Sequence, residues 1–103
     1  MVEAISKSRN SAASKSKDGA TKIFANIDVG WGNILYIRGE GDDLSWEKGI
    51  PMKNNGNNIW TWSSSTKKCI NFQYKLLIND TIWCIGENFT ANAGNDNHIA
   101  PAF

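Results

Sequence analysis

The segment that decides the fold is CINFQYKLLI, residues 69–78. Apolar side chains occupy every second position, and a strand over these residues would carry on one face Ile70, Phe72, Tyr74, Leu76 and Ile78. The opposite face would carry Cys69, Asn71, Gln73, Lys75 and Leu77. A period of two predicts a half-buried β-strand. It also predicts that Lys75 points to solvent or to a neighbouring surface feature rather than into the core.

The residues that follow predict a hairpin. Asn79-Asp80 is a turn sequence leading into 81–85, and a two-residue turn would place residue 75 opposite residue 84. Cys69 then lies too far along the ladder to form a disulfide with Cys84. We therefore expect two free thiols. Together with His98, the only histidine, the two cysteines are too dispersed to predict a metal site.

Further strands are expected on both sides of this hairpin. Alternating or apolar stretches occur at 21–29, 33–38, 44–46, 49–52, 59–62, 89–91 and 98–103. Gly, Asn and Asp separate them, most clearly in the Asn-Gly turn at 55–56. About seven short strands and no helical repeat predict an all-β fold, a small antiparallel, immunoglobulin-like β-sandwich.

Length and composition limit the chain to one small domain. It has 103 residues, of which 41% are hydrophobic and 20% charged, so it can build a core but has little interior to spare for a deep cleft. We place the folded domain at residues 21–103. Residues 1–20 are rich in Ser, Lys and Ala and are expected to form a disordered basic leader.

The charge distribution argues against a nucleic-acid partner. Residues 1–22 hold five basic and two acidic side chains, a net of +3, whereas the remaining residues hold six basic and eight acidic ones, a net of −2. A nucleic-acid-binding domain needs a positive face on its folded part.

There is also no apolar run of about eighteen residues for a membrane span and no apolar export signal. A cytoplasmic location is the expectation, with organelle targeting as a lesser alternative.

Several stretches, taken in order, carry a resemblance to a known family. They are GNILYIRG at 32–39, LSWE at 44–47, IWTW at 59–62, FQYKL at 72–76, and Trp83 followed five residues later by Asn88. Their order and spacing resemble a starch-binding domain, carbohydrate-binding module family 20, and more loosely its glycogen-binding relatives. The resemblance covers roughly residues 21–94. It implies non-catalytic binding of α-1,4-glucans such as starch, glycogen or malto-oligosaccharides, at up to two surface sites and without a cofactor.

The resemblance also implies which residues bind the carbohydrate. In the first site, two tryptophans and two polar side chains correspond to Trp46, Trp83, Lys75 and Asn88. In the second site, the aromatic positions correspond to Trp31 and Trp60. The chain departs from the family pattern at Ser45, Cys84 and Phe89, where a Gly, an acidic residue and an Arg are common. In the loop before Trp60, where another aromatic is common, it has Lys53 and a run of Asn.

These residue types suit a sugar on chemical grounds alone. A flat aromatic ring covers the C–H face of a glucose unit and removes apolar area from water, at about 25 cal/mol per Å². Lys and Asn then pair with the hydroxyls at the edge of the sugar ring. Two indole rings set at an angle would follow a curved α-1,4 chain better than a flat one. Such an exposed site should bind weakly, on the order of micromolar to millimolar.

Each of these residues also has a purely structural interpretation. Trp60 and Trp62 share a strand face, so at least one of them should pack inward, and we expect Trp62 to be the core residue. Lys75 could be a solvated strand residue and Asn88 a turn former. The sandwich would then be a protein-interaction or regulatory module that has lost sugar binding. If sugar binding is kept, the module could tether an unidentified protein partner to glycogen.

Catalysis is not expected. The loop carboxylates Asp42, Asp43, Glu47 and Glu87 could supply a pair for glycoside hydrolysis, but no groove is predicted between them. A Cys84–His98 nucleophile pair is conceivable only if the end of the chain returns to the hairpin.

Overall fold

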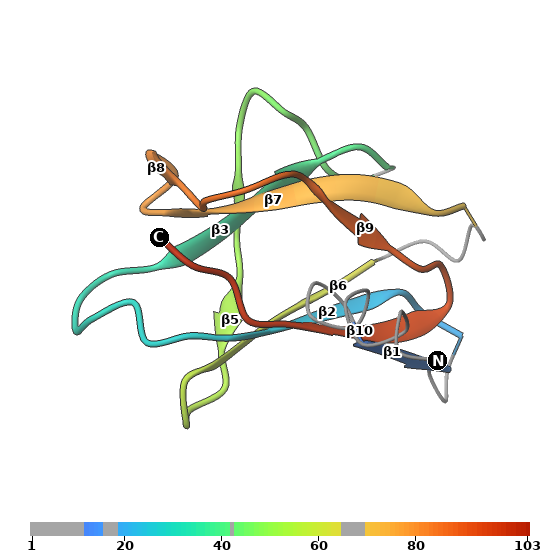
Figure 1. Ribbon diagram of the computed structural model, residues 1–103, viewed down its shortest axis with the longest axis horizontal. Coiled ribbons are helices and arrows are strands. Elements are labelled where there is room, and N and C mark those ends of the chain that lie inside the picture. The colour runs from blue at the N-terminus through green and yellow to red at the C-terminus, as the bar shows by residue number, and fades with distance from the viewer. Residues whose placement is uncertain (1–11, 16–18, 42, 65–69) are drawn as a thin grey trace.

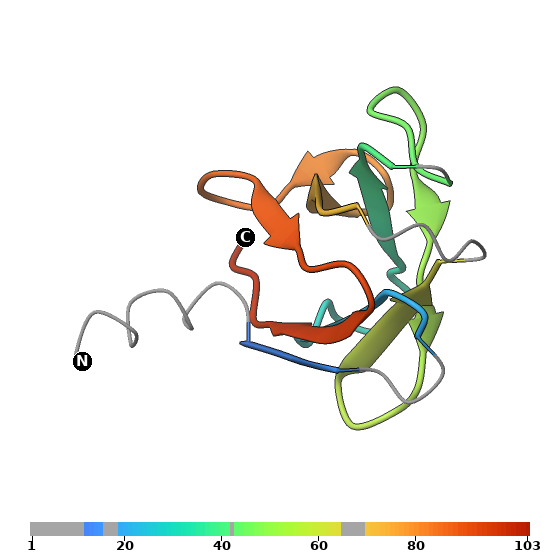
Figure 2. The same ribbon diagram turned by 90° about the vertical axis from the view of Figure 1, so that its right-hand side faces the viewer.

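The computed structural model describes residues 12–15, 19–41, 43–64 and 70–103, and their strands form two sheets (Figure 1). The first sheet has the order β1 (Ala12–Lys15), β10 (Asn95–Ile99), β2 (Lys22–Asn26), β6 (Ile59–Ser63) and β5 (Lys53–Asn54). The second has the order β4 (Ile50–Pro51), β3 (Leu35–Gly39), β7 (Phe72–Ile78) and β8 (Ile82–Trp83), and β9 (Phe89–Ala91) also pairs with β7. We call them the β2–β6 sheet and the β3–β7 sheet. They lie face to face as two layers (Figures 1 and 2), which confirms the small all-β sandwich.

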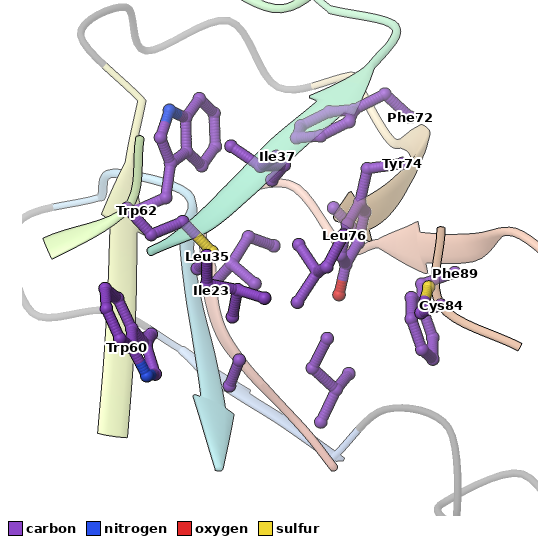
Figure 3. Close-up of a cluster of buried hydrophobic side chains, with 14 residues drawn as sticks. Ile23, Leu35, Ile37, Trp60, Trp62, Phe72, Tyr74, Leu76, Cys84 and Phe89 are labelled. Atoms are coloured by element: carbon purple, nitrogen blue, oxygen red, sulfur yellow. The ribbon is translucent and has the colours of Figure 1, made fainter. Parts of the chain in front are cut away.

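The core lies between the two sheets. The alternation expected for residues 72–78 is present, because Phe72, Tyr74 and Leu76 are buried and Gln73 and Lys75 are not. Side chains from both sheets meet there (Figure 3), and the largest of them are Ile23, Leu35, Ile37, Trp60, Trp62, Phe72, Tyr74, Leu76 and Phe89. Burial of this apolar surface is the main term that stabilises so small a domain.

One segment passes from one sheet to the other. Ile50 and Pro51 pair with β3, whereas Lys53 and Asn54 pair with β6. Met52 lies between them, is buried, and donates its N–H to the Leu35 carbonyl at 2.8 Å. The crossing therefore closes one side of the sandwich.

The β7–β8 hairpin differs from the expected register by one residue. Ile78 pairs with Ile82 and Leu77 with Trp83, so that residue 76, not 75, lies opposite Cys84. The loop has three residues instead of two: Asn79 and Asp80 adopt φ of 55° and 58°, and the Thr81 N–H donates to the Ile78 carbonyl at 3.1 Å. A shift of one residue exchanges the two faces of a strand. Cys84 consequently points into the core, and Trp83 points outward.

The ends of the chain also differ from expectation. Within the proposed disordered leader, Ala12–Lys15 forms β1 and pairs antiparallel with β10, an interaction made through the backbone and therefore without a hydropathy signature. Residues 1–11 and 16–18 lie outside the described residues. The last strand is Asn95–Ile99 rather than 98–103, and it runs parallel to β2, so the sandwich is not purely antiparallel.

A buried asparagine explains why the polar segment before Ile99 is a strand. Asn97 is fully buried, and its Nδ2 donates to the carbonyls of Lys22, Asn92 and Asn95 at 3.0–3.2 Å. Its Oδ1 accepts the Asn92 N–H at 2.9 Å. A polar side chain can occupy a core position when its hydrogen bonds are satisfied in this way, which a hydrophobic pattern does not reveal.

One polar group inside the core has no such partner within the described residues. The Tyr74 hydroxyl is buried without a hydrogen bond, and this burial, together with the Cys84 thiol, raises the pKa of Tyr74. Cys84 is a free, buried thiol, as expected, whereas Cys69 lies outside the described residues.

Within the described ranges there is no cluster of three metal-ligating side chains, nor any helix long and apolar enough to cross a bilayer.

Candidate functional site

The outer face of the β3–β7 sheet carries three of the four residues expected in the first sugar site. Trp83 lies on β8, the edge strand, and is 45% exposed. Lys75, on the neighbouring strand β7, is half-buried and points outward, as predicted. Asn88 lies just before β9, which pairs with the same strand. The hairpin and β9 therefore bring Lys75, Trp83 and Asn88 to one edge of the sheet.

The polar side chains of this edge hold the segment that follows Trp83. Lys75 Nζ donates to the Gly86 carbonyl at 2.5 Å, and Asn88 Nδ2 donates to Gln73 Oε1 at 3.1 Å. Both bonds join residues 86–88 to the outer face of β7. Lys75 and Asn88 are thus fixed in position on the outer face of β7 before any ligand arrives. Gln73 joins them as a polar residue that the sequence analysis did not identify.

Trp46 reaches the same region on a separate loop. Residues 44–49 arch over the β3–β7 sheet on the side away from the core (Figure 1). The Ser45 hydroxyl accepts the Glu47 N–H at 3.0 Å, so the serine that replaces the common glycine closes a local turn. The Trp46 side chain is half-buried, and within the described part of the chain its ring makes no stacking contact with another aromatic ring.

Arg38 connects Trp46 with Trp83. Its Nη1 donates to the Trp46 carbonyl at 3.0 Å, and its guanidinium carbon lies 5.3 Å from the centre of the Trp83 ring, over the ring face. A guanidinium in this position is attracted by the ring quadrupole. From the sequence, Arg38 is expected only to lie at the end of a strand. The pairing of β3 with β7 places it on the outer face, opposite Lys75.

The charge of Arg38 is balanced by Asp80 in the hairpin turn. Arg38 Nε lies 2.9 Å from Asp80 Oδ1, and the two side chains are 17% and 24% exposed. The hydrogen bond from Arg38, and a weaker one from the Gly49 N–H, lower the pKa of Asp80 despite the opposing effect of burial. The carboxylate is therefore ionised at neutral pH and keeps the guanidinium in place.

A small second hydrophobic cluster supports the tryptophan. Leu77 pairs with Tyr36 on one side and with Trp83 on the other, so all three side chains point to the outer face. Leu77 is fully buried although it lies outside the cluster between the sheets. Tyr36 and Trp83 are its cross-strand neighbours on this face and are placed to cover it, which gives Trp83 a structural role in addition to its exposed surface.

The two residues expected in the second sugar site line one hollow of about 520 Å³. Its walls are residues 27–33 and the turn 54–58, at one end of the β2–β6 sheet (Figure 1). Trp31 is 99% exposed on a tight turn in which the Gly30 N–H donates to Asp28 Oδ1 at 2.9 Å and both flanking glycines have positive φ. Gly30 and Gly32 permit this turn because they lack a Cβ.

Trp60 differs from the expectation of a sugar-stacking residue. It is only 6% exposed and belongs to the core together with Trp62 (Figure 3), because the two residues pair with the buried Ala25 and Ile23 of β2 and share with them the inward face of the sheet. Only a small part of Trp60 borders the hollow, so its ring face is not available for stacking. Both tryptophans of the IWTW segment are therefore core residues.

The residues considered for nucleophilic catalysis do not meet. Cys84 is buried between the sheets, whereas His98 is exposed on β10 and stacks on Phe24 at a ring distance of 4.7 Å. Phe24 and His98 lie on the outer face of the β2–β6 sheet, away from Cys84. Among the loop carboxylates, Asp42 lies outside the described residues.

Comparison with known proteins adds no assignment. A scan against protein-family models found no matching family. A search of curated proteins found no match either.

Proposed function

We propose that this domain is a non-catalytic carbohydrate-binding module that recognises α-1,4-glucans on the outer face of the β3–β7 sheet. The residues that bind the sugar are Trp46, Trp83, Lys75 and Asn88, which we call the Trp83 site. The observation that carries the proposal is the position of Trp83: the residue is 45% exposed at the edge of a sheet whose outer face also carries Lys75 and Asn88, both held by hydrogen bonds.

The polar groups of the Trp83 site retain hydrogen-bonding capacity for sugar hydroxyls. An ammonium has three N–H donors and a side-chain amide has two, together with an acceptor oxygen. Within the described residues, Lys75 uses one donor on Gly86 and Asn88 uses one on Gln73. Two donors of Lys75, one donor of Asn88 and its carbonyl oxygen remain. They lie on the same sheet face as the exposed indole of Trp83, and a glucose unit requires polar groups and an apolar ring face together.

The open geometry implies weak binding to one side of a glucan chain. The Trp83 site is a surface and not an enclosed cavity, so it covers little of the ligand, and we expect a Kd of roughly 10⁻⁶ to 10⁻³ M. Trp31, fully exposed on its own turn, would provide a second and separate contact for the same polymer. The protein partner expected for such a module would then be held near glycogen or starch.

Titration of Trp fluorescence with maltoheptaose, together with affinity electrophoresis in glycogen gels, tests the proposal. The full chain should be retarded by glycogen, and cellohexaose, a β-1,4-linked control of similar size, should not compete. Trp83→Ala should abolish retardation while the far-ultraviolet circular dichroism stays unchanged. Failure of the unaltered protein to bind any α-1,4-glucan at millimolar concentration would refute the function.

A matched pair of variants separates the two sites. Trp31→Ala removes the more exposed indole but leaves the β3–β7 sheet intact, so it should retain most of the maltoheptaose affinity. Phe24→Ala, on the outer face of the other sheet, is the control for a general loss of aromatic surface. Equal losses in Trp83→Ala and Phe24→Ala would argue against a localised site.

A protein-docking function is the second candidate. It is favoured by Ile82 and Ile85, which flank Trp83 and Cys84 in the sequence and are 54% and 65% exposed. Exposed apolar side chains can mark protein contacts. Replacing both isoleucines by Thr should leave glucan binding unchanged if the sugar hypothesis holds.

A further inference from the structure

Arg38 makes more directed contacts than any residue expected in the Trp83 site. Its side chain is 17% exposed and lies on the outer face of β3, directly opposite Lys75. Three of its N–H groups make hydrogen bonds: Nε to Asp80 Oδ1 at 2.9 Å, Nη2 to the Asp80 carbonyl at 3.1 Å, and Nη1 to the Trp46 carbonyl at 3.0 Å. The planar guanidinium is thereby fixed in both position and orientation.

Asp80, the carboxylate that pairs with Arg38, is also held in place. Asp80 Oδ2 accepts the Gly49 N–H at 3.2 Å, so the carboxylate holds the end of the loop whose middle is held by Arg38. A Cβ at position 49 would come within 2.2 Å of Asp80 Oδ1 and 3.0 Å of Tyr36 Cβ. Only glycine allows the carboxylate to approach this closely, and the loop and the hairpin turn are joined as one unit.

Trp83 completes the arrangement. The guanidinium carbon lies 5.3 Å from its ring centre. The cation therefore covers one indole face, and that face is closed to a sugar ring. Trp83 cannot insert between two glucose units, and Trp46 stands at a fixed offset from it, because the same guanidinium binds the backbone of Trp46.

We propose that Arg38 is the positioning residue of the Trp83 site: it sets the relative placement of Trp46 and Trp83 and limits Trp83 to stacking on one face. The glucan part of this inference rests on the proposed function, whereas the placement of the two indole rings does not. Lysine should not substitute for Arg38, because a single ammonium cannot make three planar contacts and also cover a ring face.

The test compares Arg38→Lys with the unaltered protein by following the indole N–H signals in proton–nitrogen NMR spectra. The chain has five tryptophans, whose signals can be assigned by single Trp→Phe replacements. Arg38→Lys should shift or broaden the signals of Trp46 and Trp83 and leave those of the core residues Trp60 and Trp62 in place. Unchanged signals for Trp46 and Trp83 would overturn the proposal.

Binding provides the second measurement. Freeing two side chains that a ligand must then immobilise should weaken maltoheptaose binding on the order of tenfold in Arg38→Lys. Lys53→Met, which removes an exposed cation on β5 of the other sheet, should have no effect. Arg38→Lys and Trp83→Phe, which keeps an aromatic ring so that binding stays measurable, should not be additive, since both act through the same ring; fully additive losses would contradict a positioning role.

The two proposals can fail separately. If the unaltered protein binds no glucan but Arg38→Lys still displaces the Trp46 and Trp83 signals, the proposed function is wrong and the positioning role stands. If glucan binds and Arg38→Lys changes neither affinity nor indole signals, the positioning role is wrong. Should Arg38→Lys fail to fold, Asp80→Asn retains the shape of the partner and removes its charge, and it should displace the same two signals to a smaller extent.

Discussion

Leu77→Ala should destabilise the domain as a core substitution does, although Leu77 lies on the outer face of the β3–β7 sheet. Its side chain is fully buried and flanked by Tyr36 and Trp83 in the sheet register. Truncation to alanine removes apolar contacts and leaves a cavity beneath the Trp83 ring. The effect therefore measures how much the aromatic surface of the proposed site depends on the residue below it.

The expected loss of stability is estimated by comparing Leu77, on the outer face of the sheet, with Leu76, on its core face. Leu→Ala in a buried position costs about 2–5 kcal/mol, and the cost depends on how far the surroundings can collapse. Trp83 is 45% exposed and can settle inward, so we expect the lower part of this range, about 2–3 kcal/mol. Leu76 points into the inter-sheet core, where rigid neighbours surround it, and Leu76→Ala should cost about 3–5 kcal/mol.

Urea and thermal unfolding test this expectation. A loss of about 2–3 kcal/mol corresponds to a fall in Tm of roughly 10–20 °C in a domain of this size, with the urea m value unchanged. Leu77→Ala should also bury more of Trp83 and shift its fluorescence to shorter wavelength. A cost below about 1 kcal/mol, typical of a surface substitution, would refute the idea that the ring rests on a buried side chain.

Further predictions concern single residues. Trp60→Ala should cost about 3–5 kcal/mol in urea unfolding, as for a core aromatic, whereas Trp31→Ala, at 99% exposure, should change stability by less than about 0.5 kcal/mol. Because the folded-state pKa of Asp80 is lowered below 3.8, its contribution to stability is present above that pH and is lost as the pH falls through the folded-state value. The Tm difference between the unaltered protein and Asp80→Asn should therefore be larger at pH 7 than at pH 2. Cys84, buried and free, should react with a thiol reagent only on unfolding when measured in a Cys69→Ser background; rapid labelling of the native state would contradict its burial.

The sequence predicts the sandwich well because the evidence for it is local. The alternation within residues 72–78 shows which side of β7 faces the core, and Lys75 points outward as that pattern requires. The turn signals also separate most of the strands, but residues 44–46 form a loop instead of a strand, and the stretch 49–52 contributes only Ile50–Pro51. Interactions through the backbone leave no such pattern, which is why β1 was not predicted and why the parallel pairing of β10 with β2 was missed.

The register between β7 and β8 is harder to predict, and it decides whether Trp83 points to the core or to the surface. With a two-residue turn at Asn79-Asp80, position 83 would lie opposite Leu76 and face the core. The three-residue turn places it opposite Leu77 and turns it outward. Only the resemblance to starch-binding domains placed Trp83 at the surface; the periodicity combined with the expected turn would have buried it. Turn length depends on a few backbone angles that residue type constrains only loosely.

The role of Arg38 could not be predicted for a different reason. Its partners are distant in sequence: Asp80 is 42 residues away and Trp46 is eight residues away. They meet only because β3 pairs with β7 and the loop at 44–49 folds back over both strands. A lone arginine at a strand end is ordinarily a solvated charge, and no local pattern distinguishes it from one that joins a loop, a turn and an aromatic ring.

The location of the Trp83 site at a sheet edge has a further physical consequence. Edge strands present unpaired backbone groups that can pair with another chain, and proteins limit this by keeping such strands short or covered. β8 has only two residues, the next segment is held against β7 by Lys75, and the Ile85 N–H donates to the Ala102 carbonyl at 2.8 Å. The hydrogen bonds that orient the proposed sugar-binding groups are thus among those that close this edge. Loss of the Lys75 bond should therefore weaken sugar binding and also increase self-association, two effects that a solvated lysine would not link.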